Sequence, residues 1–215
     1  KDSGVRGIVV NLQRFDKIMV VSEEDNDETL LFAEAGVSLT RLLNFAATHN
    51  LSGLEFASGI PGSVGGAIFM NAGSFDGAIK DTIKSVRMMK MDGEVIEIDR
   101  NDIKFSYRNT RLPKGIILGG AFGLHRGNNK KIKDKMKRLM EIRKETQPVG
   151  APSAGSIFKN PEGIAAGKLI ELVGLKGFRI GDAEVSMKHA NFIVNKGKAL
   201  AKDVLSLINI VKERV

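Results

Sequence analysis

The chain contains no cysteine and no tryptophan, and it has a single tyrosine among its 215 residues. Without cysteine, disulfide-stabilised scaffolds and cysteine-based metal sites are excluded, and a reducing compartment such as the cytosol is permitted. The scarcity of large aromatic side chains argues against the stacking platforms that bind single-stranded nucleic acid. No apolar run approaches the roughly 18 residues of a membrane span. We therefore expect a cytoplasmic protein that neither spans a membrane nor stacks single-stranded nucleic acid.

The net charge of +8 is the most uneven feature of a composition that is otherwise typical of a globular protein, with 42% hydrophobic and 27% charged residues. An excess of positive charge indicates an anionic partner, which can be a nucleic acid, a membrane surface or a phosphorylated small molecule. Much of the excess lies between Lys130 and Lys144. Apolar residues recur there at helical spacing, which favours a helix with a solvated basic face over a basic RNA-binding surface.

Short runs that are rich in β-branched or apolar residues predict the strands of the chain. They are Ile8–Leu12, Ile18–Val21, Thr29–Ala33, Val86–Met91, Glu94–Ile98, Gly115–Leu124 and Phe192–Val194. Between two of these runs stands Asp92-Gly93, the favoured two-residue turn of a β-hairpin.

Apolar residues spaced three and four apart predict the helices. We expect helices after the N-cap residue Ser38, over 130–145, near 165–173 and from Ala201 onward. The Gln147-Pro148 pair ends the second of these, because the residue before a proline avoids the α region. The stretch 148–156 is rich in Pro, Gly and Ser and is a candidate domain junction. Strands and helices mixed without regular alternation indicate an α+β fold.

The densest chemical signal is the glycine-rich segment Gly59–Ala67, which is followed by Asn71-Ala72-Gly73. Glycines tolerate positive φ and allow a ligand to approach the backbone closely, and successive N–H groups in such a loop can form an anion-binding nest. A helix that starts at Ser63–Val64 would direct its N-terminus toward a phosphate. The pattern is neither a Rossmann fingerprint nor a P-loop. The alternative is a tight turn with close backbone packing.

Three further clusters combine polar and small residues: Phe105–Thr110, Ser153–Pro161 and Gly181–Phe192. The second cluster lacks a G-x-S-x-G elbow, so a hydrolase nucleophile is not expected there. The only histidines are His49, His125 and His189, and none has a partner at ligand spacing. We therefore expect no metal site.

Together these segments resemble the UDP-N-acetylenolpyruvoylglucosamine reductases in order and spacing over nearly the whole chain. The matching strings are GLEFASGIPGSVGGAIFMNAG, FSYRNT, SAGSIFKNP with AGKLIE, and GDAEVSMKHANFIVN. The resemblance implies a vanillyl-alcohol-oxidase-type FAD-binding domain over 1–146 and a smaller α+β substrate-binding domain over 147–215. It also implies a reaction of peptidoglycan precursor synthesis, in which NADPH reduces FAD and the flavin passes hydride to the enolpyruvyl ether of a UDP-sugar.

The resemblance carries roles to individual residues. Arg108 is expected to stabilise the enolate that forms when hydride adds to the double bond, and Ser156 is expected to protonate the α-carbon. Lys144 and Asn160 are expected to contact the UDP-sugar. The residues expected to bind FAD are Gly59, Ile60, Pro61, Gly62, Ser63, Gly65, Gly66, Asn71, Ala72 and Gly73.

The chain also departs from the family pattern. The family's Gly-rich loop ending in Ser-Asn-Leu-Leu is expected before Lys1, and its catalytic Glu is expected beyond Val215, so the chain resembles a shorter-subtype member trimmed at both ends. Two rival functions remain at this point. One is another FAD oxidoreductase of the same fold that acts on an alcohol or a hydroxy acid, and the other is a basic RNA-binding module.

Overall fold

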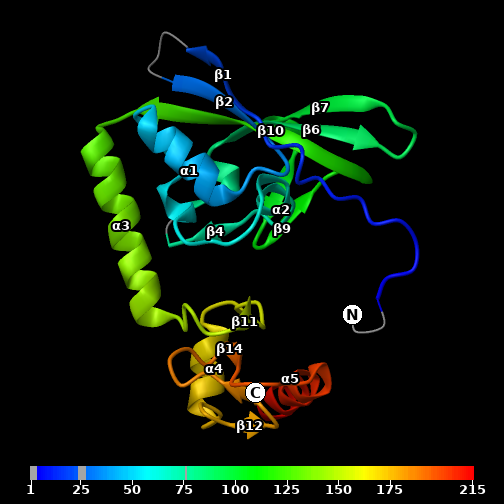
Figure 1. The fold of residues 1–215 in the computed structure, drawn as a ribbon, viewed down its shortest axis with the longest axis vertical. Coiled ribbons are helices and arrows are strands. Elements are labelled where there is room, and N and C mark those ends of the chain that lie inside the picture. Colours follow the sequence, from blue (N-terminus) through cyan, green and yellow to red (C-terminus); the bar gives the residue numbers. More distant parts are fainter. Residues whose placement is uncertain (1–3, 24–27, 76) are drawn as a thin grey trace. The chain divides into compact units, whose positions relative to one another are not determined.

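The computed structural model describes residues 4–23, 28–75 and 77–215. The chain divides into two compact units (Figure 1). The larger unit comprises Gly7–Glu141, and the smaller comprises Ile142–Val215 together with the short stretch up to Arg6. Each unit has its own hydrophobic core.

The larger unit is built around a six-stranded antiparallel sheet with the order β1-β2-β10-β6-β7, in which β3 also pairs with β10. The strands are β1 (Ile18–Glu23), β2 (Glu28–Glu34), β3 (Leu51–Ser52), β6 (Ile83–Lys90), β7 (Val95–Asp99) and β10 (Gly115–Arg126). The central strand β10 is the longest because it pairs with β2, β3 and β6 along its length. Its residues Ala121–Leu124 are almost fully buried, as their nearly continuous apolar sequence predicts.

Helices α1 (Leu39–Thr48) and α2 (Val64–Phe69) lie on the same side of this sheet in Figure 1. The hydroxyl of Ser38 caps α1 by accepting a hydrogen bond from the N–H of Arg41. Apolar side chains of both helices pack with those of the sheet into one core, whose fully buried members include Leu31, Leu42, Val64, Ile68, Phe122 and Leu124.

Two short ribbons extend from this core. One pairs β4 (Gly73–Ser74) with β5 (Gly77–Ala78), and the other pairs β8 (Lys104–Ser106) with β9 (Asn109–Arg111). Short 3₁₀ turns occur at Glu55–Ala57, Ile79–Asp81 and Arg100–Asp102.

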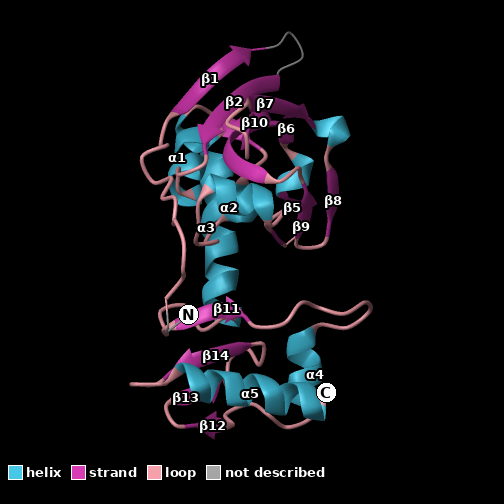
Figure 2. Cartoon of the chain, turned by 90° about the vertical axis from the view of Figure 1, so that its right-hand side faces the viewer, coloured by secondary structure: helices cyan, strands magenta, loops and turns pink. Residues whose placement is uncertain are grey.

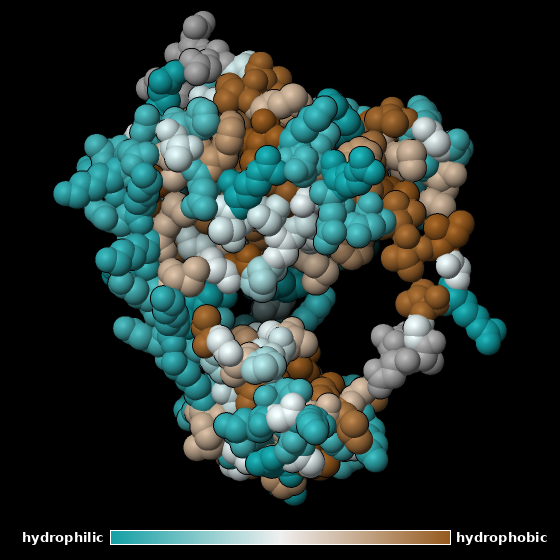
Figure 3. Space-filling view, viewed as in Figure 1, coloured by the Kyte–Doolittle hydropathy of each residue, from teal (hydrophilic) through white to brown (hydrophobic). Residues whose placement is uncertain are grey.

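Helix α3 (Asn129–Thr146) carries the basic segment, and it ends before Pro148 as predicted. Ile132 is its only buried residue among those described, and Met136 packs partly against the core of the larger unit. The face of α3 seen in Figure 3 is almost entirely hydrophilic. The sequence prediction of a helix with a solvated basic face is therefore confirmed.

The smaller unit contains a four-stranded antiparallel sheet with the order β11-β14-β13-β12 (Figure 2). The strands are β11 (Ser153–Ser156), β12 (Arg179–Ile180), β13 (Ala183–Val185) and β14 (Phe192–Asn195). Helices α4 (Ala166–Leu172) and α5 (Ala201–Arg214) complete the unit. Its core comprises Ile170, Leu175, Ala183, Val185, Ala190, Ile193, Leu207 and Val211.

The α+β fold, the predicted helices and all but one of the predicted strands are confirmed. The strand expected at Ile8–Leu12 is wrong, because the described backbone there is irregular and Ile8 and Val9 are 95% and 75% exposed. A β-branched run forms a strand only where it can pair with a neighbour, and no strand in the described part of the chain pairs with this run. In the described parts of the chain, no helix combines the length and the apolar character that crossing a bilayer requires.

Candidate functional site

The glycine-rich segment lies between a short 3₁₀ turn and α2, and it is joined by backbone hydrogen bonds to the residues that follow β2. The N–H of Val64 donates to the carbonyl of Val37 at 2.8 Å, and the N–H of Gly65 donates to Ala35 at 2.9 Å. In the opposite direction, the carbonyl of Gly62 accepts a hydrogen bond from Leu39 at 3.0 Å. The loop is thus held against the start of α1.

These bonds change the expected manner of anion binding. The first two N–H groups of α2 are satisfied by backbone carbonyls, and the third, from Gly66, donates to the hydroxyl of Ser63 at 3.3 Å. The N-terminus of α2 therefore does not offer its amides to a phosphate. Within the segment Gly59–Gly66, the backbone N–H groups that have no partner among the described residues are those of Gly59, Gly62 and Ser63, which precede the helix. The loop N–H groups can form an anion-binding nest, whereas those of the first turn of α2 are already bonded within the protein.

A cavity of about 360 Å³ lies beside this loop. This volume is near the lower limit for ligand pockets, so the cavity suits part of a dinucleotide. It is lined by three residues that the sequence predicted, Ser63, Gly65 and Gly66, and by others that it did not: Asn11, Leu12, Gln13, Ala35, Gly36, Phe69, Gly115 and Ile117. The sequence holds no motif around these additional residues, because they come from four separate segments of the chain.

The glycines of the loop differ in what a side chain would meet. A Cβ added to Gly65 would lie 2.9 Å from the Cβ of Ala35, so close packing within the protein requires this glycine. A Cβ added to Gly66 would meet only the hydroxyl of Ser63, at 3.5 Å, and one on Gly62 would meet nothing within 4 Å. Gly66 is exposed and lines the cavity. The open space beside it therefore fits a bound cofactor.

The Asn71-Ala72-Gly73 turn does not line this cavity. Asn71 is buried and has a φ of 41°, and its side-chain amide donates to the carbonyl of Ser106 at 3.0 Å. Its side-chain oxygen accepts the N–H of Lys80 at 3.0 Å. A Cβ on Gly73 would lie 2.7 Å from the carbonyl oxygen of Gly77. The turn therefore joins α2 to the β8–β9 ribbon and to the β4–β5 ribbon.

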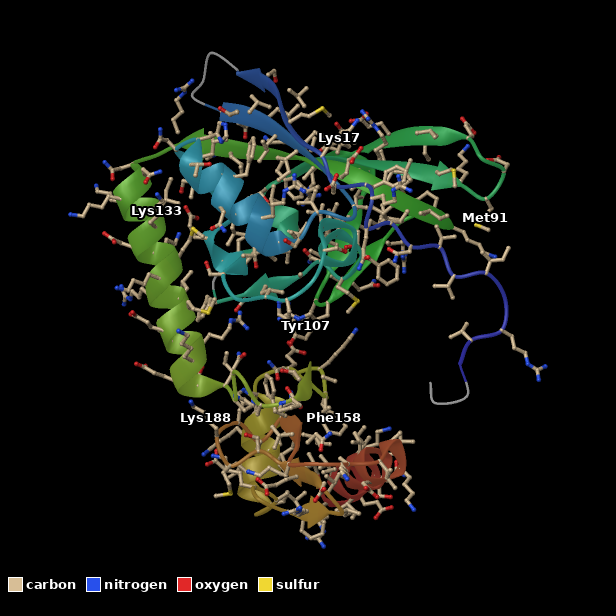
Figure 4. The ribbon with its side chains drawn as sticks, in the orientation of Figure 1. Lys17, Met91, Tyr107, Lys133, Phe158 and Lys188 are labelled. Atoms are coloured by element: carbon tan, nitrogen blue, oxygen red, sulfur yellow. The ribbon has the colours of Figure 1, made fainter. Side chains whose placement is uncertain are left out.

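Arg108 occupies the tip of the β8–β9 ribbon, next to Tyr107, which Figure 4 labels. It has a φ of 53°, a left-handed conformation that is uncommon for a residue other than glycine or asparagine. The guanidinium lies 5.0 Å from the ring centroid of Tyr107, within cation–π range, and it makes no ion pair with any described residue. Its charge is therefore available to a ligand.

Ser156 is the last residue of β11 and follows Gly155, whose φ is 84°. It is exposed, and its hydroxyl makes no hydrogen bond within the described part of the chain. Two residues later, the backbone of Phe158 forms two hydrogen bonds with the buried side chain of Asn191. Its N–H donates to the amide oxygen at 2.9 Å, and its carbonyl accepts from the amide nitrogen at 2.8 Å.

The two residues predicted to bind the UDP-sugar are both exposed. Lys144 lies in the last turn of α3, where its carbonyl accepts a hydrogen bond from the ammonium of Lys188. The side-chain oxygen of Asn160 accepts the N–H of Ala166, the first residue of α4, at 3.1 Å. The amide nitrogen of Asn160 is left to donate to a ligand.

The Gly181–Phe192 cluster has a mainly structural role. The hydroxyl of Ser186 accepts the N–H groups of Lys188 and His189, and the N–H of Asn191 approaches Nδ1 of His189 at 3.2 Å. Burial lowers the pKa of His189, and the positive charge of Lys176 acts in the same direction. The neutral ring is favoured, as expected for a side chain packed edge-on against Phe192.

A second cavity of about 410 Å³ in the larger unit borders Glu55, His125 and Lys135. The carboxylate of Glu55 is buried and accepts hydrogen bonds from the hydroxyl of Ser52 at 2.7 Å and from the N–H of Gly53 at 3.1 Å. The ammonium of Lys135 lies 3.6 Å away. With its charge satisfied in this way, Glu55 stabilises the turn that leads into the glycine-rich loop.

Comparison with known proteins matches two parts of the chain to family descriptions. Residues 147–215 match the family description "UDP-N-acetylenolpyruvoylglucosamine reductase, C-terminal domain", and residues 1–99 match "FAD binding domain". A UDP-N-acetylenolpyruvoylglucosamine reductase of Clostridium novyi is 48% identical over all of this chain and 69% of its own length. The corresponding protein of Caldanaerobacter subterraneus is 45% identical, with 70% of its length covered.

A solved structure agrees with these sequence matches. The crystal structure of the UDP-N-acetylenolpyruvylglucosamine reductase of Thermus caldophilus superposes with a TM-score of 0.80 at 42% sequence identity. The match covers 86% of this chain and 68% of the other.

Proposed function

The chain belongs to the family of UDP-N-acetylenolpyruvoylglucosamine reductases, and we propose that Arg108 and Ser156 carry the charge and proton chemistry of the family's reaction. The enzyme is an FAD-dependent oxidoreductase that uses NADPH to reduce UDP-N-acetylenolpyruvoylglucosamine to UDP-N-acetylmuramate in peptidoglycan precursor synthesis. Neither rival function drawn from the sequence, a flavoenzyme for hydroxy acids or an RNA-binding module, is favoured by these relationships.

We propose that FAD is held by the loop before α2. The free N–H groups of Gly59, Gly62 and Ser63 would bind the anionic pyrophosphate, and the open space at Gly66 would receive the cofactor. Of the remaining predicted residues, Ile60, Pro61 and Gly65 would shape this loop, whereas Asn71, Ala72 and Gly73 would fix the turn that follows α2. When bound, FAD supplies the hydride that it has received from NADPH.

Arg108 would bind the carboxylate of the enolpyruvyl group. Addition of hydride to the β-carbon leaves negative charge on the α-carbon and its carboxylate, and a cation placed there stabilises that charge as it develops. Two observations support this role, namely the absence of an ion-pair partner and the left-handed backbone at the tip of the ribbon. Strained backbone of this kind gathers at functional sites.

Ser156 would donate a proton to the α-carbon. A serine hydroxyl is weakly acidic, so it can protonate only a strongly basic carbon such as that of an enolate. Its exposure and the absence of a hydrogen bond support this role, because a serine that served only to cap a turn would be bonded to the backbone.

Lys144 and Asn160 would contact the UDP-sugar. An exposed ammonium suits a phosphate, and the free amide nitrogen of Asn160 suits a carbonyl or hydroxyl oxygen. Residues 1–146 would form the FAD-binding domain, and residues 147–215 would form the substrate-binding domain. We also propose a cytoplasmic location without nucleic acid or membrane partners, consistent with the lack of cysteine.

A direct assay tests the proposed function. The FAD-loaded enzyme, mixed with NADPH and UDP-N-acetylenolpyruvoylglucosamine, should form UDP-N-acetylmuramate in equal amount to the NADPH consumed, as measured by mass spectrometry and absorbance at 340 nm. Hydroxy acids and simple alcohols should neither reduce the oxidised flavin nor reoxidise the reduced flavin. Turnover of a hydroxy acid without formation of UDP-N-acetylmuramate would contradict the assignment.

The proposed FAD loop has its own test. Gly66→Val places a side chain in the open space beside the cavity, so it should abolish FAD retention while the melting temperature of the apoprotein stays within a few degrees of the parent. Gly65→Ala is the matched control, because its Cβ would meet Ala35 and should lower that melting temperature. A Gly66→Val protein that keeps its full visible flavin band would exclude contact at this position.

A further inference from the structure

We propose that Asn71 and Thr110 are positioning residues for the family's reaction, which together hold Arg108 in its left-handed conformation at the tip of the β8–β9 ribbon. This inference rests on the proposed role of Arg108. It assigns a function to the second glycine-containing turn, which the sequence had predicted to contact FAD directly.

The two side chains hold the ribbon on both sides of its tip. The amide nitrogen of Asn71 donates to the carbonyl of Ser106, two residues before Arg108, at 3.0 Å. The hydroxyl of Thr110, two residues after Arg108, donates to the carbonyl of Ile68 at 2.5 Å. Asn71 and Thr110 are 4% and 5% exposed, so water does not compete strongly for either bond.

The orientation of Asn71 is itself determined by the structure. Its side-chain oxygen accepts the N–H of Lys80, which leaves its amide nitrogen directed at Ser106. The carbonyl of Lys80 in turn accepts a hydrogen bond from Nε of Arg100, whose guanidinium lies 4.6 Å from the ring centroid of Phe105 in β8. The contacts thus form a continuous path from the turn after α2 to the ribbon.

The ribbon needs this support because it is short. β8 and β9 have three residues each, and an isolated two-stranded ribbon is only marginally stable in water. A left-handed arginine adds strain that the surrounding structure must offset. Without the two bonds, we expect the tip to relax and the guanidinium to lose its fixed position.

One bond ends in the short helix α2, and the other comes from the second residue after it. Ile68 lies in the last turn of α2 and Asn71 lies just beyond it, while Gly65 and Gly66 in the first turn line the cavity. One six-residue helix therefore fixes the cavity proposed for FAD and the cation proposed to bind substrate. A displacement of about 1 Å in such an arrangement can cost about 10²-fold in rate.

The test uses two substitutions of Thr110 in the FAD-loaded enzyme. Thr110→Val keeps the side-chain shape and removes the donor, whereas Thr110→Ser keeps the hydroxyl. Thr110→Val should slow reoxidation of the reduced flavin by UDP-N-acetylenolpyruvoylglucosamine about 10- to 100-fold. Thr110→Ser should stay near the parent rate, and reduction of the flavin by NADPH should be unchanged in both. The affinity for the product UDP-N-acetylmuramate, measured by calorimetry, should weaken less than the rate falls.

A double mutant separates positioning from general support of the fold. In an Arg108→Ala background, Thr110→Val should have almost no further effect, because no guanidinium remains to be positioned. A full additional loss in that background would overturn the proposal and leave Thr110 a structural residue. If Arg108→Ala slows reoxidation of the flavin but Thr110→Val leaves its rate unchanged, only the positioning role fails. If Arg108→Ala is itself normal, the proposed function of Arg108 fails and the positioning role fails with it.

Asn71→Asp provides an independent measurement should Thr110→Val fold poorly. The carboxylate still accepts the N–H of Lys80, but it presents an oxygen to the carbonyl of Ser106 where the parent presents a donor. We expect the same loss in the reoxidation step, with the same lack of additivity with Arg108→Ala. Parent-like reoxidation in Asn71→Asp would overturn the proposal.

Discussion

The ribbon tip that carries Arg108 and the strand end that carries Ser156 are built in a similar way in two different units. In each, a buried asparagine binds the backbone two residues from the proposed functional side chain, Asn71 at Ser106 and Asn191 at Phe158. In both cases the asparagine is more than 30 positions away in the sequence from the backbone group that it binds. The similarity indicates that a buried side-chain amide holds each of these short segments in place.

The two segments differ in where buried side chains bind them. The ribbon is bonded on both sides of Arg108, whereas the contacts of Asn191 lie only on the C-terminal side of Ser156. Gly155 on the other side has a positive φ and open space around it. This difference fits the two roles, because a cation stabilises developing charge best when it need not move, while a proton donor must be accessible.

The largest expected effect comes from removing the accessible hydroxyl. Ser156→Ala should slow reoxidation of the reduced flavin by the substrate about 10²- to 10⁴-fold, the range for loss of a general acid. Reduction by NADPH involves no enolate and should stay normal. Stopped-flow flavin absorbance measures both steps. Ser156→Cys, which offers a donor of different acidity, should recover part of the rate. Equal reoxidation rates in Ser156→Ala and the parent would remove Ser156 from the chemistry.

A somewhat smaller effect is expected from removing the fixed cation. Arg108→Ala should lower kcat about 10²- to 10³-fold, as found for loss of a preorganised charge-stabilising donor. Arg108→Lys tests whether a fixed geometry is needed beyond the charge, because it keeps the charge but not the planar fork that binds a carboxylate through two bonds. We expect the kcat of Arg108→Lys to lie between those of Arg108→Ala and the parent. A rise in KM with unchanged kcat would indicate that Arg108 contributes uniform binding only.

The asparagine of the smaller unit should matter less for rate and more for stability. Asn191→Asp replaces a buried donor with an acceptor facing the carbonyl of Phe158, and it should cost about 1–3 kcal/mol in the free energy of unfolding. Asn195→Asp is the matched control, because among the described residues the side chain of Asn195 only accepts bonds, from the N–H groups of Gly197 and Ala199, and a carboxylate can do the same. Urea denaturation measures the free energy of unfolding of both variants. Equal losses of stability in Asn191→Asp and Asn195→Asp would show that Asn191 does not support its segment through the donated bond.

The smallest effect concerns pH, and it applies to the Ser156 segment, because His189 accepts the N–H of Asn191, the residue that holds this segment. Burial lowers the pKa of His189 below its unfolded value of about 6.5, so folding favours the neutral ring. Its contribution to stability should be complete above about pH 6.5 and should be lost as pH falls toward the lower folded pKa. Thermal melts from pH 8 to pH 5 should show this loss, and His189→Gln should reduce it. Melts that gain stability over this interval would contradict the assigned direction.

Local patterns in the sequence predicted most of the fold. The Ser38 cap, the Asp92-Gly93 turn and the apolar spacing of the helices each act within a few residues, so they can be read without knowledge of the partners. The motifs around Arg108 and Ser156 were found for the same reason, since each is a continuous string. The strand expected at Ile8–Leu12 was wrong because pairing depends on a neighbour that the run itself does not specify.

Tertiary structure decided what the individual polar groups do. Nothing local separates Gly65, which packs on Ala35, from Gly66, which borders the cavity. Likewise, the bond from Thr110 to Ile68 and those from Asn191 to Phe158 join residues that are 42 and 33 positions apart. A hydrogen bond is determined by where its two groups lie in space, and folding sets those positions through the packing of the whole core. The sequence therefore determined which residues are chemically capable, and the tertiary structure decided which of them are free to act.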